Sequence, residues 1–79
     1  RGECDFVVQR GVEIDSLIQV TWEMEDQETR QREISGLVEA AKATGCHNLY
    51  IITADSSDDV ILDNGMTIHV LPAWRWLLM

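Results

Sequence analysis

The hydrophobic positions in the first third of the chain predict two strands joined by a tight turn. Residues 4–9 form a short apolar run rich in β-forming side chains, and Arg10-Gly11 is a turn signal. From Glu13 to Met24, apolar and polar residues alternate with the period of two that is typical of a strand. We therefore expect an antiparallel hairpin whose second strand has two faces, one with Ile18, Val20, Trp22 and Met24 and the other with Leu17, Gln19, Thr21 and Glu23.

The pattern then changes to a helical period over residues 26–44. An apolar stripe recurs at the i, i+3, i+4, i+7 spacing of one helix face, in Ile34, Leu37, Val38 and Ala41. Acidic residues at 25, 26 and 28 suit the N-terminal end of the helix dipole, and Gly45 is a residue that commonly closes a helix. This structural role of the acidic cluster is favoured over the alternative of a cation or partner site.

The second half of the chain predicts two further strands and a short terminal helical turn over residues 73–79. Residues 48–53 form a nearly continuous apolar run, which is typical of a parallel strand covered on both faces. Residues 54–64 are polar and predict a loop, and after the turn at Asn64-Gly65 a last strand covers 66–71 and stops at Pro72. The fold class is therefore α/β, a small mixed β-sheet with a crossover helix in a single domain spanning residues 1–79.

Charge narrows the classes of partner. The 79 residues include 6 Lys and Arg against 14 Asp and Glu, giving a net charge of -8, which repels nucleic-acid backbones and suits basic partners. Cys4 and Cys46 have neither zinc-site nor disulfide-framework spacing, and no apolar run is long enough to span a membrane. We expect reduced thiols and a cytoplasmic location.

Candidate chemistry is concentrated on the hairpin, at Asp5, Gln19 and Thr21. Metal-dependent nucleases of the restriction-endonuclease-like fold place an Asp on one strand and Glu-x-Lys on the next, so that two carboxylates hold Mg²⁺ and the Lys orients water. Here Gln19 and Thr21 replace the Glu and the Lys. Only one carboxylate is left at these three positions, so we predict neither a catalytic residue nor a metal site there. We interpret the pocket as the remnant of a nuclease site.

Two alternatives remain open at this pocket. Weak divalent-metal binding near Asp5 could persist, with Glu3 or Glu23 supplying a second carboxylate because each shares a face with a motif position. The polar side chains could instead hydrogen-bond one another. Elsewhere the chain has no glycine-rich phosphate loop, and His47, His69 and the Asp-rich segment 55–59 are interpreted as packed or solvated residues.

The C-terminal residues Trp74, Trp76 and Leu77 are too apolar for a free tail. They either pack back onto the sheet or dock on a neighbouring domain or a second subunit, which makes an oligomer possible, because aromatic anchors dominate interfaces. We name these three residues as the candidate partner-binding site.

At this point a resemblance becomes visible in five segments: residues 4–8 (Cys-Asp-Phe-Val-Val), 17–21 (Leu-Ile-Gln-Val-Thr), 29–34 (Thr-Arg-Gln-Arg-Glu-Ile), 51–53 (Ile-Ile-Thr) and 71–78 (Leu-Pro-Ala-Trp-Arg-Trp-Leu-Leu). Their order and spacing resemble the C-terminal domain of unknown function on many prokaryotic AAA+ superfamily ATP-binding proteins. The resemblance implies a restriction-endonuclease-like core, similar to archaeal Holliday-junction resolvases and truncated at the N-terminus. It also implies a parent ATPase whose upstream domain uses ATP and Mg²⁺.

Three functions follow as hypotheses. The first is a non-catalytic interaction or regulatory domain that docks on the upstream ATPase domain or on another protein. The second is a weak metal-dependent nuclease of the Holliday-junction-resolvase type, using Asp5 with Glu3 or Glu23. The third is structure-dependent DNA binding without cleavage, which needs a basic patch formed from Arg1, Arg10, Arg30, Arg32 and Arg75.

Overall fold

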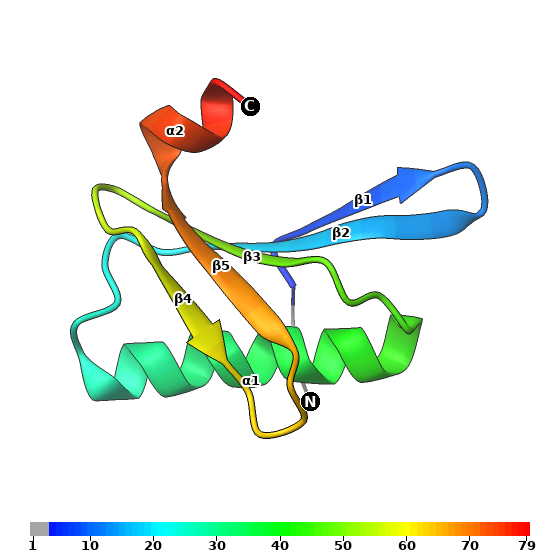
Figure 1. Cartoon of the computed structure of the whole chain (residues 1–79), viewed down its shortest axis with the longest axis horizontal. Coiled ribbons are helices and arrows are strands. Elements are labelled where there is room, and N and C mark those ends of the chain that lie inside the picture. Colours follow the sequence, from blue (N-terminus) through cyan, green and yellow to red (C-terminus); the bar gives the residue numbers. More distant parts are fainter. Residues whose placement is uncertain (1–3) are drawn as a thin grey trace.

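The computed structural model describes residues 4–79 and has a five-stranded mixed sheet with one helix on each face (Figure 1). The strand order is β1-β2-β3-β5-β4. The elements in chain order are β1 (Phe6–Arg10), β2 (Glu13–Val20), α1 (Gln27–Thr44), β3 (Leu49–Thr53), β4 (Asp58–Ile61), β5 (Thr67–Pro72) and α2 (Ala73–Leu77). The predicted α/β class, with a mixed sheet and a crossover helix, is confirmed.

The predicted hairpin is present as β1 and β2. The two strands pair antiparallel, and Gly11 takes the positive φ of 65° that the tight connection requires. The pairing is regular over Phe6–Val8 and shifts between Val8 and Gln9, which is a β-bulge. One detail of the prediction is wrong: β2 ends at Val20, so Met24 leaves the strand's alternation and packs into the core on the α1 side.

The helix α1 begins and ends where its capping residues predict. The Asp26 side chain accepts a hydrogen bond from the Thr29 N–H at 3.0 Å, and this bond is the main reason that the pKa of Asp26 is lowered. Gly45 closes the helix in the left-handed conformation, with φ 76°, and donates its N–H to the Ala41 carbonyl. The helix connects β2 to β3, and these two strands are parallel, as predicted.

The predicted loop over residues 54–64 is wrong in part, because it contains strand β4. This strand of four residues pairs antiparallel with β5 through the turn at Gly65. Two aspartates, which are rare in strands, mask it in the sequence. They are tolerated because β4 is an edge strand with only Val60 partly buried against the core.

The two faces of the sheet are covered unequally. The 18-residue α1 covers one face, and the main core lies beneath it, centred on Leu17, Leu37, Leu49, Ile51 and Ile68. On the opposite face, called the open face below, the five-residue α2 covers only a second small cluster of Ile18, Ile52 and Leu71 (Figure 1). A sheet normally buries each apolar face against another layer. Here α2 is too short to cover the whole open face, so apolar side chains stay exposed on it.

Candidate functional site

The structure brings Asp5 and Gln19 together, as the hairpin alternation predicts. The backbone N–H of Asp5 donates to Oε1 of Gln19 at 2.8 Å, and the backbone N–H of Val20 donates to Oδ2 of Asp5 at 2.8 Å. Gln19 is buried on the α1 side of β2, next to Ile51 in register. The two side chains thus form a reciprocal latch that holds the start of the chain's first strand against β2.

Thr21 and Glu23 lie on the segment after β2 and serve the start of α1. The Thr21 hydroxyl donates to the Glu23 carbonyl at 3.4 Å. The Glu23 carboxylate accepts from the backbone N–H groups of Glu25 and Asp26, at 3.1 and 3.3 Å. Both oxygens of Glu23 are therefore engaged in the turn, and Glu3, the other carboxylate named above, lies outside the described residues.

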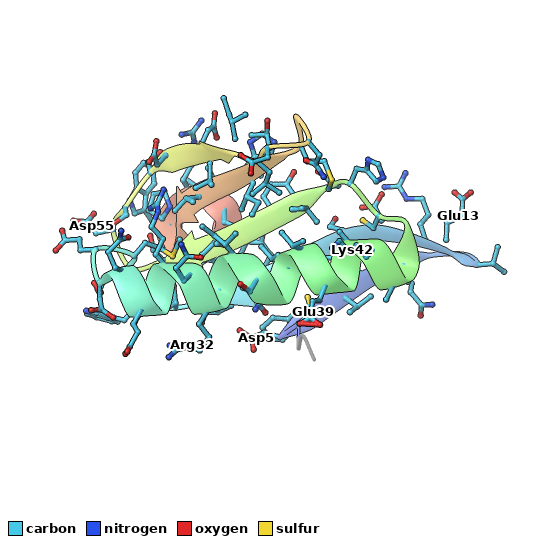
Figure 2. The ribbon with its side chains drawn as sticks, turned by 90° about the horizontal axis from the view of Figure 1, so that it is seen from below. Asp5, Glu13, Arg32, Glu39, Lys42 and Asp55 are labelled. Atoms are coloured by element: carbon cyan, nitrogen blue, oxygen red, sulfur yellow. The ribbon has the colours of Figure 1, made fainter. Side chains whose placement is uncertain are left out.

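Glu33 is a member of this site that sequence analysis missed. Its side chain is only 12% exposed, and its pKa is raised, first by burial and next by the negative charge of Asp5, against the opposing effect of Arg32. The Arg32 Nε lies 3.5 Å from its Oε2. Figure 2 shows Asp5 and Arg32 along the same side of α1. Glu33 precedes the apolar stripe by one residue, and this border position is the signal that could have located it.

These residues do not fit a nuclease-type Mg²⁺ centre. Such a centre needs hard oxygen ligands with negative charge, and Gln19 offers one neutral oxygen that already accepts a hydrogen bond. Across residues 4–79, no three His, Cys, Asp or Glu side chains converge closely enough to hold a metal ion. The arrangement of Asp5 and Gln19 instead does a structural task.

The C-terminal residues named as a partner site divide into two groups. Trp76 packs against the cluster of Ile18, Ile52 and Leu71 on the open face. Trp74 is 60% exposed and Leu77 is 73% exposed, and neither belongs to a core cluster. Other large apolar side chains are also exposed on this side of the domain. Phe6, Val8 and Val20 lie on the open face, Trp22 follows β2, and Leu78 and Met79 follow α2.

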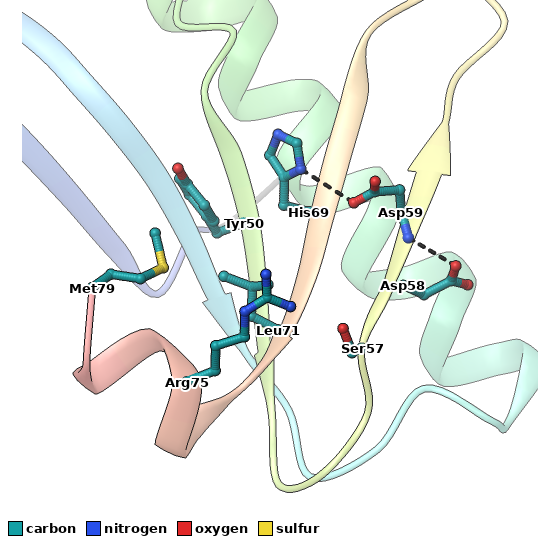
Figure 3. A pocket seen from close by; sticks show the side chains of 8 residues that line it. All are labelled: Tyr50, Ser57, Asp58, Asp59, His69, Leu71, Arg75 and Met79. Carbon is teal, nitrogen blue, oxygen red and sulfur yellow. Dashed lines mark hydrogen bonds and ion pairs between the residues drawn. The ribbon is translucent and has the colours of Figure 1, made fainter.

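A second group of chemically capable residues lies on the open face, between α2 and β4 (Figure 3). Here an open hollow of about 580 Å³ contains His69, whose Nδ1 lies 3.2 Å from Oδ1 of Asp59. The Tyr50 ring lies beside the imidazole, with ring centroids 5.6 Å apart. The remaining lining residues are Ser57, Asp58, Leu71, Arg75 and Met79.

Sequence analysis treated His69 and Asp59 as unrelated residues. The β4–β5 register places them opposite each other on one face, but this is visible only once β4 is recognised as a strand. The pair lies on the face opposite Gln19, whose side chain points toward α1. His69 and Asp5 therefore cannot serve one reacting centre.

The described arginines do not form a single basic patch. Arg10 ends β1, Arg30 and Arg32 lie on α1, and Arg75 lies on α2 across the sheet from α1. Arg1 lies outside the described residues. Neither helix in the described part of the chain has the combined length and apolarity that a membrane crossing requires.

The fold and site together define a small α/β domain with a mixed sheet and an unequal covering of its two faces. Comparisons with protein-family models, curated proteins and solved structures found no match to this chain. What the domain does must therefore be inferred from its own residues.

Proposed function

We propose that this chain is a non-catalytic interaction or regulatory domain of a AAA+ ATPase, built on a degenerate restriction-endonuclease-like scaffold. The observation that carries the proposal is the exposed apolar surface on and around α2, where Trp74 and Leu77 stand free of the core. Neither side chain belongs to a core cluster, and exposed apolar side chains that lie together are typical of an interaction surface. Interface hot spots are enriched in such aromatic anchors.

The chemistry of the expected partner follows from charge. With a net charge of -8, the domain attracts a surface whose apolar centre is bordered by Lys and Arg. The first candidate is the ATPase domain that the family resemblance implies upstream. ATP and Mg²⁺ would act in that domain, and the contact with α2 would report or restrain its state.

The test is co-purification of this chain with the ATPase domain of its parent protein. Trp74→Ala and Leu77→Ala should each weaken the complex by about tenfold or more, the scale of a hot-spot truncation. Val12→Ala is the matched control, because Val12 is 96% exposed in the turn between β1 and β2, which lies far from α2 (Figure 1). Equal binding by all four proteins would refute docking through α2.

The second candidate function is a weak metal-dependent nuclease. It is favoured only by the position of Asp5, directly before β1, beside Gln19 on the adjacent strand β2, which is similar to the nuclease pattern. The double variant Gln19→Glu, Thr21→Lys restores the Asp and Glu-x-Lys pattern of the nucleases and tests whether this scaffold can support DNA cleavage. We expect no Mn²⁺-dependent DNA cleavage by the wild type and a gain of cleavage in the double variant, which Asp5→Asn should abolish. Cleavage by the wild type that Asp5→Asn removes would establish the enzymatic function instead.

A further inference from the structure

The two edges of the sheet are protected differently. The β4 edge carries exposed charges at Asp58 and Asp59, which deter pairing with another strand. The β1 edge reads Phe-Val-Val-Gln-Arg and carries no charge before Arg10. β1 is an edge strand whose five residues are all exposed, and no strand within residues 4–79 pairs with its outer side.

The hydrogen-bond directions show which groups this edge offers. The Leu17 N–H donates to the Asn48 carbonyl, on the side of β2 that faces β3. Residues directly opposite in an antiparallel pair exchange both backbone bonds or neither. Because Val7 lies opposite Leu17, its N–H and C=O point away from β2 and into the open edge.

From these observations we infer that β1 pairs antiparallel with β1 of a second copy of this chain, about a two-fold axis at Val7. The regular part of the strand, Phe6–Val8, is centred on that residue, and the bulge begins after it. The two Val7 residues exchange their outward backbone bonds. Phe6 then lies opposite Val8 of the second copy on the open face, an apolar cross-strand pair.

Charge and register make this edge complementary to itself. Asp5 precedes the strand and Arg10 ends it, so antiparallel pairing brings the acidic end of one strand toward the basic end of the other. An axis at Val8 would instead place Phe6 opposite Arg10 and Val7 opposite Gln9. The Val7 register is therefore the one that buries apolar side chains on both faces.

The resulting dimer has a continuous ten-stranded sheet with both α1 helices on one face, because a two-fold axis normal to the sheet preserves its faces. The open faces of the two copies join through Phe6 and Val8. This inference does not depend on the proposed docking through α2, since it uses the β1 edge of the sheet and no residue of α2.

Two copies that each carry a net charge of -8 repel one another, so the dimer has a characteristic salt dependence. Raising NaCl from about 50 mM to about 500 mM shortens the Debye length from roughly 14 Å to roughly 4 Å and should increase the dimer fraction severalfold. A contact with a basic partner would weaken under the same change.

The experiment combines sedimentation of the 79-residue chain with cysteine cross-linking. In a Cys4→Ser background, Val7→Cys should form a disulfide-linked dimer, because residue 7 faces itself at a Cα separation of about 5.5 Å, within disulfide reach. Val12→Cys is the control for random collision and should stay monomeric under non-reducing conditions. Val7→Lys should raise the dimer dissociation constant at least tenfold, and Val12→Lys should leave it unchanged.

Three results would overturn the inference. A monomer at every protein and salt concentration would exclude the dimer. Equal cross-linking of Val12→Cys and Val7→Cys would show that collision alone explains the product. Cross-linking of Val8→Cys in place of Val7→Cys would show that the axis is not at Val7. If Val7→Lys fails to fold by circular dichroism, the Val7→Cys result decides alone.

Discussion

Among single residues, Asp5 stabilises the fold by joining the start of the hairpin to β2. Its carboxylate accepts the Val20 N–H and its own N–H is held by Gln19, so truncation removes an acceptor from the edge of the hairpin. We expect Asp5→Ala to lower the free energy of unfolding by about 1–2 kcal/mol, the scale of a lost charge-assisted hydrogen bond. Asp5→Asn keeps an acceptor oxygen and should lose less than half of that. Urea denaturation measures both, and equal losses would contradict the latch.

Glu33 makes stability depend on pH. Because its pKa is raised in the folded state, the folded protein binds this proton more tightly than the unfolded chain does. That contribution is complete below the ordinary pKa of 4.5 and is lost as pH rises through the folded-state pKa. Glu33→Gln should therefore gain on the order of 0.5 kcal/mol over the wild type at pH 7.

The same variant should gain nothing at a pH well below 4.5, where Glu33 is protonated in both the folded and the unfolded state. Chemical denaturation at the two pH values gives the comparison, and Glu25→Gln, at an exposed carboxylate, is the matched control. A gain at pH 7 that persists unchanged in acid would show that burial and the charge of Asp5 are not the cause.

The residues of the Asp5 site differ in how far the sequence could locate them. Gln19 follows from strand alternation, because every second residue of β2 faces α1. Glu33 could not be located, since a charged residue at the border of a helical stripe faces solvent unless a neighbouring strand covers it. His69 and Asp59 needed a register between two strands, which hydrophobic periodicity does not supply.

At the scale of elements, the two tryptophans of α2 have different roles: Trp76 packs against the sheet and Trp74 lies on the surface. Trp76→Ala should destabilise the domain by about 2–3 kcal/mol, because its ring covers Ile52 and Leu71 on the open face. Trp74→Ala should change stability by less than about 0.5 kcal/mol, since Trp74 is exposed. Thermal and urea unfolding of both variants, followed by circular dichroism, tests the division. Equal destabilisation would mean that Trp74 also packs.

The elements themselves were predicted with unequal success. The hairpin, α1, β3 and β5 carry clear periodic or apolar patterns, and α2 follows a strand-ending proline. The short β4 has only Val60 facing the core, so no pattern of two or more apolar residues marks it. Its existence depends on pairing with β5, a tertiary cause that propensity cannot report.

Over residues 4–79, acidic charge is spread over the surface and the cations do not share one face of the molecule. Arg10 lies at the end of β1, Arg30, Arg32 and Lys42 lie at different points along α1, and Arg75 lies on α2, on the far side of the sheet (Figure 1). Nucleic-acid binding requires several cations along one track, because each neutralised phosphate releases counterions. The described surface of this domain offers no such track.

This distribution predicts a clear preference between polyanions and polycations. In fluorescence anisotropy at about 50 mM salt, labelled duplex and four-way-junction DNA should show no saturable binding, because a domain with a net charge of -8 repels the phosphates. A labelled lysine-rich peptide should bind under the same conditions and be released as salt increases, since its attraction to the acidic surface is screened. Arg30→Glu is the matched variant for the DNA arm. Saturable binding of the four-way junction that Arg30→Glu abolishes would show that arginines of α1 bind DNA. That result would favour structure-dependent DNA binding over docking on a basic protein surface.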